Sequence, residues 1–292
     1  MEDFEYRSPE SLDEALTLLR RRKKTKALAG GTDLVVQMKD LRVAPTALVD
    51  VKNIPELNRL EVTADGTLHV GAAVSLSRML AFAPVKQKYT ILYQACSLIG
   101  SMQIRSRATM GGNICNAAPS ADSAPALICL GGKAVAASLA KGTRTLPVAE
   151  FFRGPGRCAL EPNELLVELE IPSPPRHSGG CYLRHTTREE MDIAVVGVGV
   201  VLTRDGQPDR YRDVKISLGA VAPTPIRVPE AESLLAGKTL DERLIGQAAE
   251  IAAGAASPIS DVRASADYRR ELIKVLVKRA IAGARQSIEE SN

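Results

Sequence analysis

The segment at residues 105–127, RSRATMGGNICNAAPSADSAPAL, concentrates glycine, asparagine, proline, serine and aspartate in one short run. These residue types favour turns and helix ends over the interiors of helices and strands. We therefore expect no ordinary helix or strand in the segment until a helix begins near its end. A backbone with so many turn-forming residues is expected to follow a specific path, which predicts a chain that wraps around a ligand.

A related glycine pair occurs earlier, in GGTD at residues 30–33, between an apolar strand pattern and the start of a helix pattern. Two consecutive glycines allow positive φ and have no Cβ to block an approaching group. The N–H groups that follow would point outward at a helix N-terminus, where an anion binds favourably. A structural turn is the alternative, since the pair has neither a P-loop nor a GxGxxG pattern around it.

The glycine pair in TMGGN at residues 109–113 has a similar pattern, so the two turns could face one pyrophosphate. Asp122 follows in the same segment. A carboxylate repels phosphates, so we expect Asp122 to bind hydroxyl groups, such as those of a ribose or ribityl chain. Its alternative role is to cap the helix pattern ADSAPALICL. Two phosphate-binding turns and a hydroxyl-binding acid together predict a dinucleotide ligand.

Composition excludes several functional classes. With 292 residues, 45% of them apolar and 25% charged, the chain has the size and composition of about two globular domains. A net charge of +4 with interleaved acids and bases, and an aromatic content of 3%, argue against nucleic-acid binding. No window reaches 18 consecutive apolar residues, and the acidic N-terminus has no signal-peptide core. We therefore expect neither a membrane span nor a secretory signal.

The five cysteines are scattered and form no CxxC pair, which indicates reduced thiols in a cytoplasmic protein. Iron–sulfur clusters usually need closely spaced thiolates, so no cluster is expected on this chain. The three histidines share no metal-ligand spacing, and no nucleophile elbow accompanies them. We expect neither a bound metal nor a hydrolase triad, and the simplest interpretation of each cysteine is a buried structural residue.

Secondary-structure patterns divide the chain into three blocks, residues 1–55, 56–172 and 173–292. The first block alternates helix and strand, and its first helix begins with a capping box from Ser11 to Glu14. Its expected elements are a helix at 11–22, strands at 26–29 and 47–51, and a basic run at 20–24 that forms the solvated helix end.

The second and third blocks each combine a sheet with helices. Asp65–Gly66 predicts a hairpin between two strands, and one helix is expected over 84–99. The segment PSPPRHSGGC at 172–181 has the composition of a linker. Beyond it we expect two strands, then helices near 228–236, 241–255 and 265–286. The expected fold class is therefore α+β.

Three stretches closely resemble one known family. AGGTDL at 29–34 and TMGGNICNAAPSAD at 109–122 look like the two FAD-binding signatures of the medium subunits of molybdenum hydroxylases, the xanthine dehydrogenase and carbon monoxide dehydrogenase family. YLRHTTREEMDIAVVGVGV at 182–200 resembles the start of that family's C-terminal domain. The resemblance covers nearly the whole chain. It implies a vanillyl-alcohol-oxidase-type (PCMH-like) FAD-binding fold of two α/β subdomains, plus a C-terminal domain of a sheet with helices.

The resemblance also implies a set of cofactor-binding residues. The two glycine turns would hold the pyrophosphate from opposite sides, and Asp122 would bind sugar or ribityl hydroxyls. Leu166 would pack against the cofactor, and Arg184 would stand beside the flavin and favour its anionic reduced state. Without the resemblance, core packing explains Leu166 and a surface cation explains Arg184. The full set is Leu28, Ala29, Gly30, Gly31, Thr32, Asp33, Leu34, Ile104, Ala108, Thr109, Gly111, Gly112, Asn113, Asp122, Leu166, Arg184, Asp192 and Ile193.

The implied function is that of an electron-transfer subunit without an acid–base catalyst of its own. A molybdopterin-binding large subunit would oxidise the substrate. Electrons would pass through [2Fe–2S] clusters of a small subunit to FAD, and then to NAD⁺, a quinone or another acceptor. A dimer of heterotrimers is the expected assembly. Two alternatives stay open: a stand-alone FAD-dependent oxidoreductase of the same fold, and a nucleotide-binding scaffold without redox activity.

Overall fold

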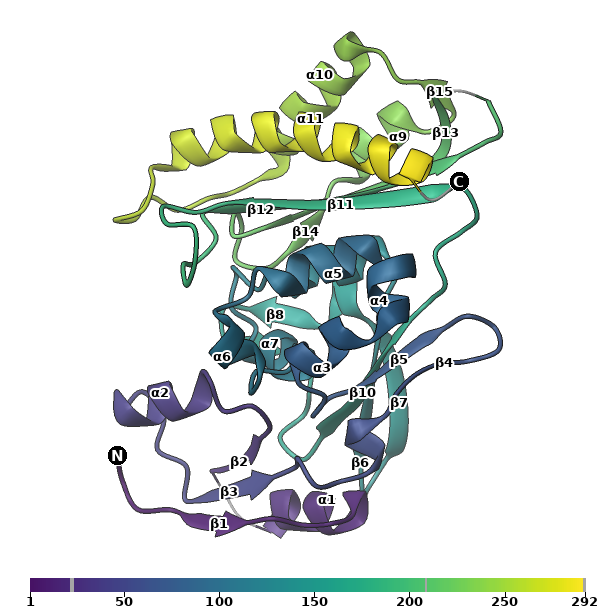
Figure 1. Cartoon of the computed structure of the whole chain (residues 1–292). Helices are drawn as coiled ribbons and strands as arrows, with labels where there is room; N and C mark the ends of the chain where they lie inside the picture. Colours follow the sequence, from purple (N-terminus) through teal and green to yellow (C-terminus); the bar gives the residue numbers. More distant parts are fainter. Residues whose placement is uncertain (22–23, 208, 291–292) are drawn as a thin grey trace.

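The computed structural model describes residues 1–21, 24–207 and 209–290. Figure 1 shows the main sheets stacked in chain order, from the N-terminal sheet in purple to the C-terminal sheet in green. A small two-stranded sheet of β8 (Phe152–Gly154) and β9 (Arg157–Cys158) belongs to the middle layer. None of the helices within the described ranges is both long and apolar enough to cross a membrane.

The first sheet consists of parallel pairs, with β3 between β1 and β2. Parallel neighbours need long crossover connections, and two helices lie in these connections. Ser11 accepts a hydrogen bond of 3.3 Å from the Glu14 N–H, as predicted, whereas the Glu14 carboxylate accepts from the Glu10 N–H. The predicted basic run lies partly outside the described residues, at 22 and 23. The elements are β1 (Glu5–Arg7), α1 (Leu12–Arg21), β2 (Thr25–Leu28), α2 (Leu34–Lys39) and β3 (Ala47–Asp50).

The second sheet is antiparallel, in the order β4-β5-β10-β6-β7. The predicted hairpin at Asp65–Gly66 is confirmed, because Gly66 has φ +84° and the Asp65 carboxylate accepts a hydrogen bond of 3.1 Å from the Thr67 N–H. The elements are η1 (Glu56–Asn58), β4 (Leu60–Val62), β5 (Leu68–Gly71), β6 (Lys133–Ser138), β7 (Gly142–Pro147), η2 (Val148–Glu150) and β10 (Leu165–Ile171).

The single helix expected over 84–99 is wrong, because the structure has two helices there. They are α4 (Ala83–Lys88) and α5 (Thr90–Ser97), and they follow α3 (Leu76–Ala81). The break falls at Tyr89, whose backbone leaves helical geometry at φ −116° and ψ 49°. The Tyr89 side chain is fully buried, and its hydroxyl donates a hydrogen bond of 2.6 Å to the Gly66 carbonyl. This contact fixes the tyrosine beneath the hairpin, where a continuous helix would not place it.

The glycine-rich segment at 105–127 is largely helical, which corrects the expectation of an irregular path. It holds the end of α6 (Met102–Arg105), then α7 (Met110–Asn116) and most of α8 (Ser123–Cys129). Its polar residues act at helix ends: the Thr109 hydroxyl caps α7 by accepting from the Gly112 N–H at 2.8 Å. Ala117 ends α7 in a left-handed conformation at φ 48°. The turn-forming residues therefore separate three short helices.

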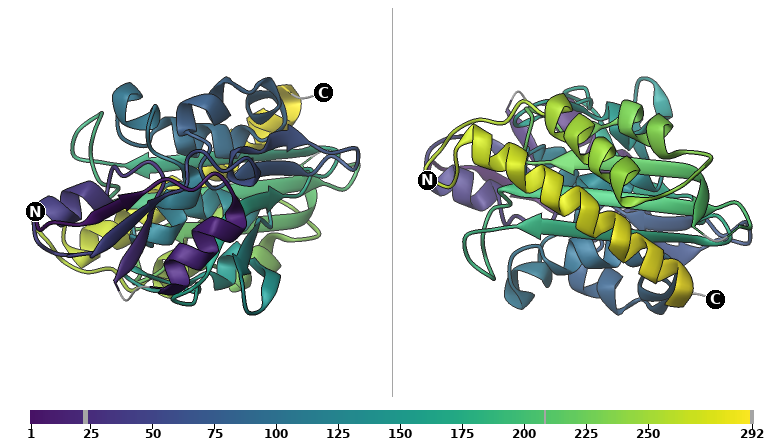
Figure 2. Two further views of the ribbon diagram at one scale, coloured as in Figure 1. Left: turned by 90° about the horizontal axis from the view of Figure 1, so that it is seen from below. Right: turned by 90° about the horizontal axis from the view of Figure 1, so that it is seen from above.

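The third sheet is formed by the C-terminal part of the chain. Figure 2 shows the yellow helix α11 lying across this sheet on the side away from the first sheet. The helices predicted near 228–236, 241–255 and 265–286 are confirmed. The elements are β11 (Ser178–His185), β12 (Val196–Arg204), β13 (Arg210–Gly219), β14 (Ile226–Arg227), α9 (Pro229–Leu235), β15 (Lys238–Thr239), α10 (Glu242–Ala255) and α11 (Ala266–Glu290).

The linker predicted at 172–181 is too long, because β11 begins inside it at Ser178 and pairs with β12 along its whole length. Gly179 shows the reason. A Cβ at this position would lie 2.5 Å from the Ala284 carbonyl oxygen, so glycine allows α11 to pack directly on the strand. Gly179 therefore serves close packing, although the composition of residues 172–181 is that of a linker.

Two apolar clusters form the core. The first extends from Ala15 in α1 to Ile171 at the end of β10 and also takes in Tyr182 and Val201 of the third sheet, so the first two layers share one core that reaches the third. The second lies between the third sheet and the helices α9, α10 and α11. The two glycine segments therefore belong to layers that are packed together.

Candidate functional site

A cavity of about 690 Å³ lies between the first sheet, the helices α2 and α7 and the loop that leads into β10. Its volume is in the range of small-molecule and cofactor sites. Among the described residues, all of the expected cofactor-binding residues line it except Arg184. These are Leu28, Ala29, Gly30, Gly31, Thr32, Asp33, Leu34, Ile104, Ala108, Thr109, Gly111, Gly112, Asn113, Asp122, Leu166, Asp192 and Ile193.

The first glycine pair brings two distant parts of the chain into contact. A Cβ at Gly30 would lie only 2.3 Å from the Arg107 carbonyl oxygen, so the turn after β2 packs against the backbone between α6 and α7. Gly31 has φ +74°, a conformation that glycine adopts without strain. The Val35 N–H then donates to the Gly31 carbonyl at 3.0 Å, which starts the helical turn leading into α2.

The second glycine pair has a different geometry from the first, because both of its residues lie inside α7. A Cβ at Gly111 would lie 2.8 Å from the Ala72 Cα, so this glycine allows α7 to approach the backbone after β5. The nearest atom to a Cβ at Gly112 would be the Thr109 Oγ1, at 3.0 Å. Both glycines line the cavity, but the side-chain position of Gly111 is filled by Ala72, whereas that of Gly112 meets only the Thr109 hydroxyl within 4 Å.

Side-chain amides connect the helices around the cavity. The Gln37 Nε2 of α2 donates to the Asn116 Oδ1 of α7 at 2.9 Å, and the Ser123 hydroxyl of α8 donates to the Asn113 Oδ1 at 2.6 Å. Sequence reasoning missed Gln37 and gave Asn116 no role. No local pattern marks either residue, since the contact depends on how α2 and α7 are placed. The loop residues Leu160, Glu161, Pro162 and Glu164, and Leu165 at the start of β10, were missed for the same reason, although they also line the cavity.

Asp122 is buried at the cavity wall and is bound on both carboxylate oxygens. Its Oδ1 accepts from the Tyr182 hydroxyl at 2.7 Å, and its Oδ2 accepts from the Arg184 Nη1 at 2.8 Å. Burial raises the pKa of Asp122, although the Arg184 charge and the two hydrogen bonds act in the opposite direction. The alternative of a helix cap is wrong, because Asp122 precedes α8 without a capping side-chain hydrogen bond. Burial, followed by the Asp122 charge, raises the pKa of Tyr182 well above its usual range.

Arg184 is placed behind Asp122. Its side chain is 5% exposed and pairs with the Asp122 carboxylate, and it is not among the described residues that line the cavity. Asp192 and Ile193 lie at the opening, in the loop from β11 to β12. The N–H groups of Arg188 and Ile193 donate to Asp192 at 2.9 and 2.8 Å, and these bonds lower its pKa. Ile193 is 48% exposed.

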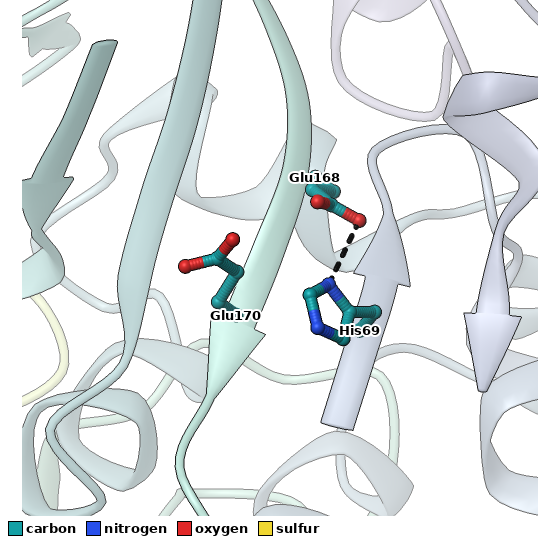
Figure 3. Close-up of side chains that lie close together, drawn as sticks. All are labelled: His69, Glu168 and Glu170. Carbon is teal, nitrogen blue, oxygen red and sulfur yellow. Dashed lines mark hydrogen bonds and ion pairs between the residues drawn. The ribbon is translucent and has the colours of Figure 1, made fainter. Parts of the chain in front are cut away.

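A second polar cluster lies outside the cavity, on the second sheet. Figure 3 shows the ring of His69 on β5 directed toward Glu168 on β10, with Glu170 two residues along the same strand. The His69 Nδ1 is 3.2 Å from the Glu168 Oε2, and the Arg59 guanidinium is 3.4 Å from both Glu168 oxygens. His69, Glu168 and Glu170 are residue types that can bind a metal ion. The Glu168 carboxylate, however, already pairs with the Arg59 guanidinium.

The cavity has the features that an extended dinucleotide requires. Two backbone segments meet without Cβ atoms, one carboxylate is held at the wall, and apolar side chains such as Leu166 complete the surface. Residues 2–174 match the family described as FAD binding domain in molybdopterin dehydrogenase. Residues 182–284 match the CO dehydrogenase flavoprotein C-terminal domain. Fold and site together define an FAD-binding flavoprotein.

Similar proteins extend over nearly the whole chain. The xanthine dehydrogenase FAD-binding subunit of Escherichia coli O157:H7 is 32% identical over 97% of this chain and 97% of its own length. The carbon monoxide dehydrogenase medium chain of Hydrogenophaga pseudoflava is 33% identical over 96% of each chain. The chain therefore belongs to the family of FAD-binding medium subunits of molybdenum hydroxylases.

Solved structures agree with this assignment. Carbon monoxide dehydrogenase from Hydrogenophaga pseudoflava, in a form that lacks the Mo-pyranopterin moiety of its molybdenum cofactor, has a chain with a TM-score of 0.92 and 32% identity, covering 97% of both chains. Quinoline 2-oxidoreductase from Pseudomonas putida 86 has a chain with a TM-score of 0.92 and 31% identity, covering 98% of both. The predicted fold class and the predicted cofactor, FAD, are confirmed.

Proposed function

We propose that this chain binds FAD between its two glycine segments and acts as the electron-transfer subunit of a molybdenum hydroxylase complex. The observation that supports the placement most directly is the close approach of Gly30 to the Arg107 backbone, which brings both segments to one cavity. Similarity to proteins named FAD-binding subunit and medium chain supports the role in a complex.

The backbone N–H groups of residues 30–34 and 109–111 are proposed to hold the pyrophosphate, because the first N–H groups of a helix have no partner within it. The Gly112 and Asn113 N–H groups already donate to Thr109, so these two residues are proposed to line the phosphate position. Asp122 is proposed to accept hydrogen bonds from ribose or ribityl hydroxyls. Each carboxylate oxygen can accept more than one hydrogen bond, so the contacts with Tyr182 and Arg184 leave capacity for a ligand. Arg184 then positions Asp122 and sets the charge behind it.

Apolar residues are proposed to orient and shield the flavin. Leu166 is 2% exposed and gives the cavity a packed wall, with Ile104 and Ala108 on the α6–α7 side. Asp192 and Ile193, at the opening, are proposed to lie near the isoalloxazine ring. FAD, when bound, supplies the redox chemistry, and the protein residues bind it, orient it and limit its contact with water.

The proposed partners are a molybdopterin-binding large subunit, which oxidises the substrate, and a small [2Fe–2S] subunit as the electron source. NAD⁺, a quinone or another acceptor is the proposed electron sink, and a dimer of heterotrimers is the proposed assembly. A cytoplasmic location is proposed because all five cysteines are free.

We also propose domain boundaries at residues 1–55, 56–172 and 173–292. The gaps between sheets support them: β3 ends at Asp50 and β4 begins at Leu60, while β10 ends at Ile171 and β11 begins at Ser178.

A single substitution tests the placement of FAD. Gly112→Val adds bulk on the cavity side of α7, and FAD per purified chain is expected to fall about tenfold or more, since a steric cost above about 1.4 kcal/mol suffices. Absorption of the bound flavin measures the content, and circular dichroism checks the fold. The matched control is Gly254→Val in α10, where a Cβ meets no described atom within 4 Å. A folded Gly112→Val chain with normal FAD content would show that the placement is wrong.

A further inference from the structure

Two cysteines meet in the wall of the cavity. Cys115 lies near the end of α7 and Cys158 at the end of β9, and both line the cavity. Their thiols are hydrogen-bond partners. The backbone holds the two segments together, because the Gly156 N–H donates to the Ala117 carbonyl at 3.0 Å. The scattered cysteines of the sequence thus include one pair that the fold brings together.

The surroundings of the pair make its two thiols unequal. The hydrogen bond from Cys115 and the N–H groups of Leu160 and Cys158, together with the charge of Lys26 on β2, lower the pKa of Cys158 to about 6, against the opposing effect of burial. The pKa of Cys115 is raised well above its usual range, first by its hydrogen bond to Cys158 and then by burial. Cys158 therefore has the character of a nucleophilic thiolate, and Cys115 that of a proton-donating partner.

The acidic groups that follow Cys158 in the chain are paired with cations. Glu161 and Glu164, in the loop after β9, also line the cavity. Glu164 is paired with Arg144 at 2.7 Å and Glu161 with Lys141 at 2.6 Å, so their charges are largely compensated. The remaining cysteines provide an internal comparison, because Cys96, Cys129 and Cys181 are buried and burial raises the pKa of each thiol.

We propose that Cys115 and Cys158 form a peroxide-reactive dithiol site in the wall of the cofactor cavity. The Cys158 thiolate attacks one oxygen of hydrogen peroxide, the O–O bond breaks, and sulfenic acid and hydroxide form. The Cys115 thiol then attacks the Cys158 sulfur, and hydroxide leaves as water with a proton. In total, two thiols and one hydrogen peroxide give one disulfide and two waters, with two electrons passing from sulfur to peroxide.

The site has a consequence for the cofactor, and this part rests on the proposed function. Because both cysteines line the cavity, bound FAD is expected to shield them from reagents. A disulfide joins α7 to β9 beside Asn116 and changes the wall that FAD contacts. Oxidation is therefore expected to weaken FAD retention, and bound FAD is expected to slow oxidation.

Peroxide treatment of the purified full chain without FAD tests the site. Mass spectrometry is expected to find a dithiothreitol-reversible cross-link between the peptides of Cys115 and Cys158. Cys115→Ser is expected to give a Cys158 sulfenic acid that dimedone traps, and Cys158→Ser to give neither product. Cys181→Ser, outside the cavity, is the control and keeps the cross-link. Peroxide oxidation of the chain without the Cys115–Cys158 cross-link would overturn the proposal.

Alkylation by iodoacetamide gives a second readout. The rate at Cys158 is expected to reach half of its maximum near pH 6, as the pKa of about 6 requires. At pH 6 it should exceed the rate of an unperturbed cysteine peptide by about tenfold, after the lower intrinsic nucleophilicity of a low-pKa thiolate is included. A rate equal to that of the peptide contradicts the proposal.

The FAD-loaded chain separates the two proposals. Slower Cys158 alkylation with FAD than without it supports the shared cavity, whereas equal rates in a chain with bound FAD overturn the shielding. A chain that binds no FAD would refute the proposed function, and the cross-link in the FAD-free chain would still decide the dithiol site.

Discussion

Glycines with the same sequence pattern meet different steric demands at the residue scale. Gly30 allows contact between two segments, Gly111 allows α7 to approach the chain after β5, and Gly112 leaves space in the cavity. The sequence predicts that glycine is needed at these positions because a ligand approaches. The structure shows that two of the three are needed for packing, which depends on distant backbone that no local pattern reveals.

Substitution of Gly111 is expected to affect folding. In Gly111→Ala the new Cβ would lie 2.8 Å from Ala72 backbone atoms, which cannot move as a flexible side chain can. Overpacking of this kind costs about 1–3 kcal/mol of unfolding free energy, which urea denaturation measures. Gly254→Ala, in an open part of α10, is the control and should be neutral or slightly stabilising. Equal stability of the two variants would show that Ala72 yields to the methyl group.

Loss of the Asp122 charge is expected to destabilise the fold, because Asp122 forms a buried ion pair with Arg184. Asp122→Asn leaves the Arg184 guanidinium buried without an anion, at a cost of about 3 kcal/mol. Adding Arg184→Met removes the unpaired charge, so the double variant should regain part of the lost stability in urea denaturation. A double variant no more stable than Asp122→Asn would show that the loss does not come from an unpaired Arg184 charge.

Element boundaries follow from sequence where side chains act locally. The hairpin at Asp65–Gly66, the cap at Ser11 and the amphipathic C-terminal helices are set by neighbouring residues, and all were predictable. The break at Tyr89 and the start of β11 at Ser178 were not. Each depends on a partner far along the chain: the hairpin turn that accepts the Tyr89 hydroxyl hydrogen bond, and the helix α11 packed against Gly179.

The start of α11 supports a pH-dependent prediction. Burial raises the pKa of Asp261, but hydrogen bonds from the Arg263 and Ala264 N–H groups and from Arg269 outweigh it and lower the pKa to about 2. The unfolded chain binds this proton more readily than the native chain. The stability that Asp261 confers is therefore present above about pH 4 and lost as the pH falls toward about 2.

Thermal unfolding of Asp261→Asn should show this effect. The variant is expected to be less stable than the parent chain at pH 6, with the difference shrinking to near zero at pH 2. Asp267→Asn is the matched control, because Asp267 is 95% exposed and forms only a surface pair with Arg270 among the described residues. A difference that persists unchanged at pH 2 would assign the loss to something other than the Asp261 charge.

The whole molecule places one cavity where its layers meet. The first two layers share a core and supply the two glycine segments, while the third contributes the β11–β12 loop at the opening and Arg184 behind Asp122. Two motifs and one acid are enough to predict a dinucleotide from sequence. The loop at 160–164 and the cysteine pair could not be predicted, because only the complete fold brings them to the cavity.

Titration of the FAD-free chain with FAD tests the central claim most directly. A cavity that binds FAD in the native chain predicts saturation near one FAD per chain. It also predicts a rise in unfolding free energy of about 2.7 kcal/mol when free FAD reaches about 100 times its dissociation constant. A chain that retains no FAD after free FAD is removed, and that keeps the same stability at high FAD concentration, would contradict the account.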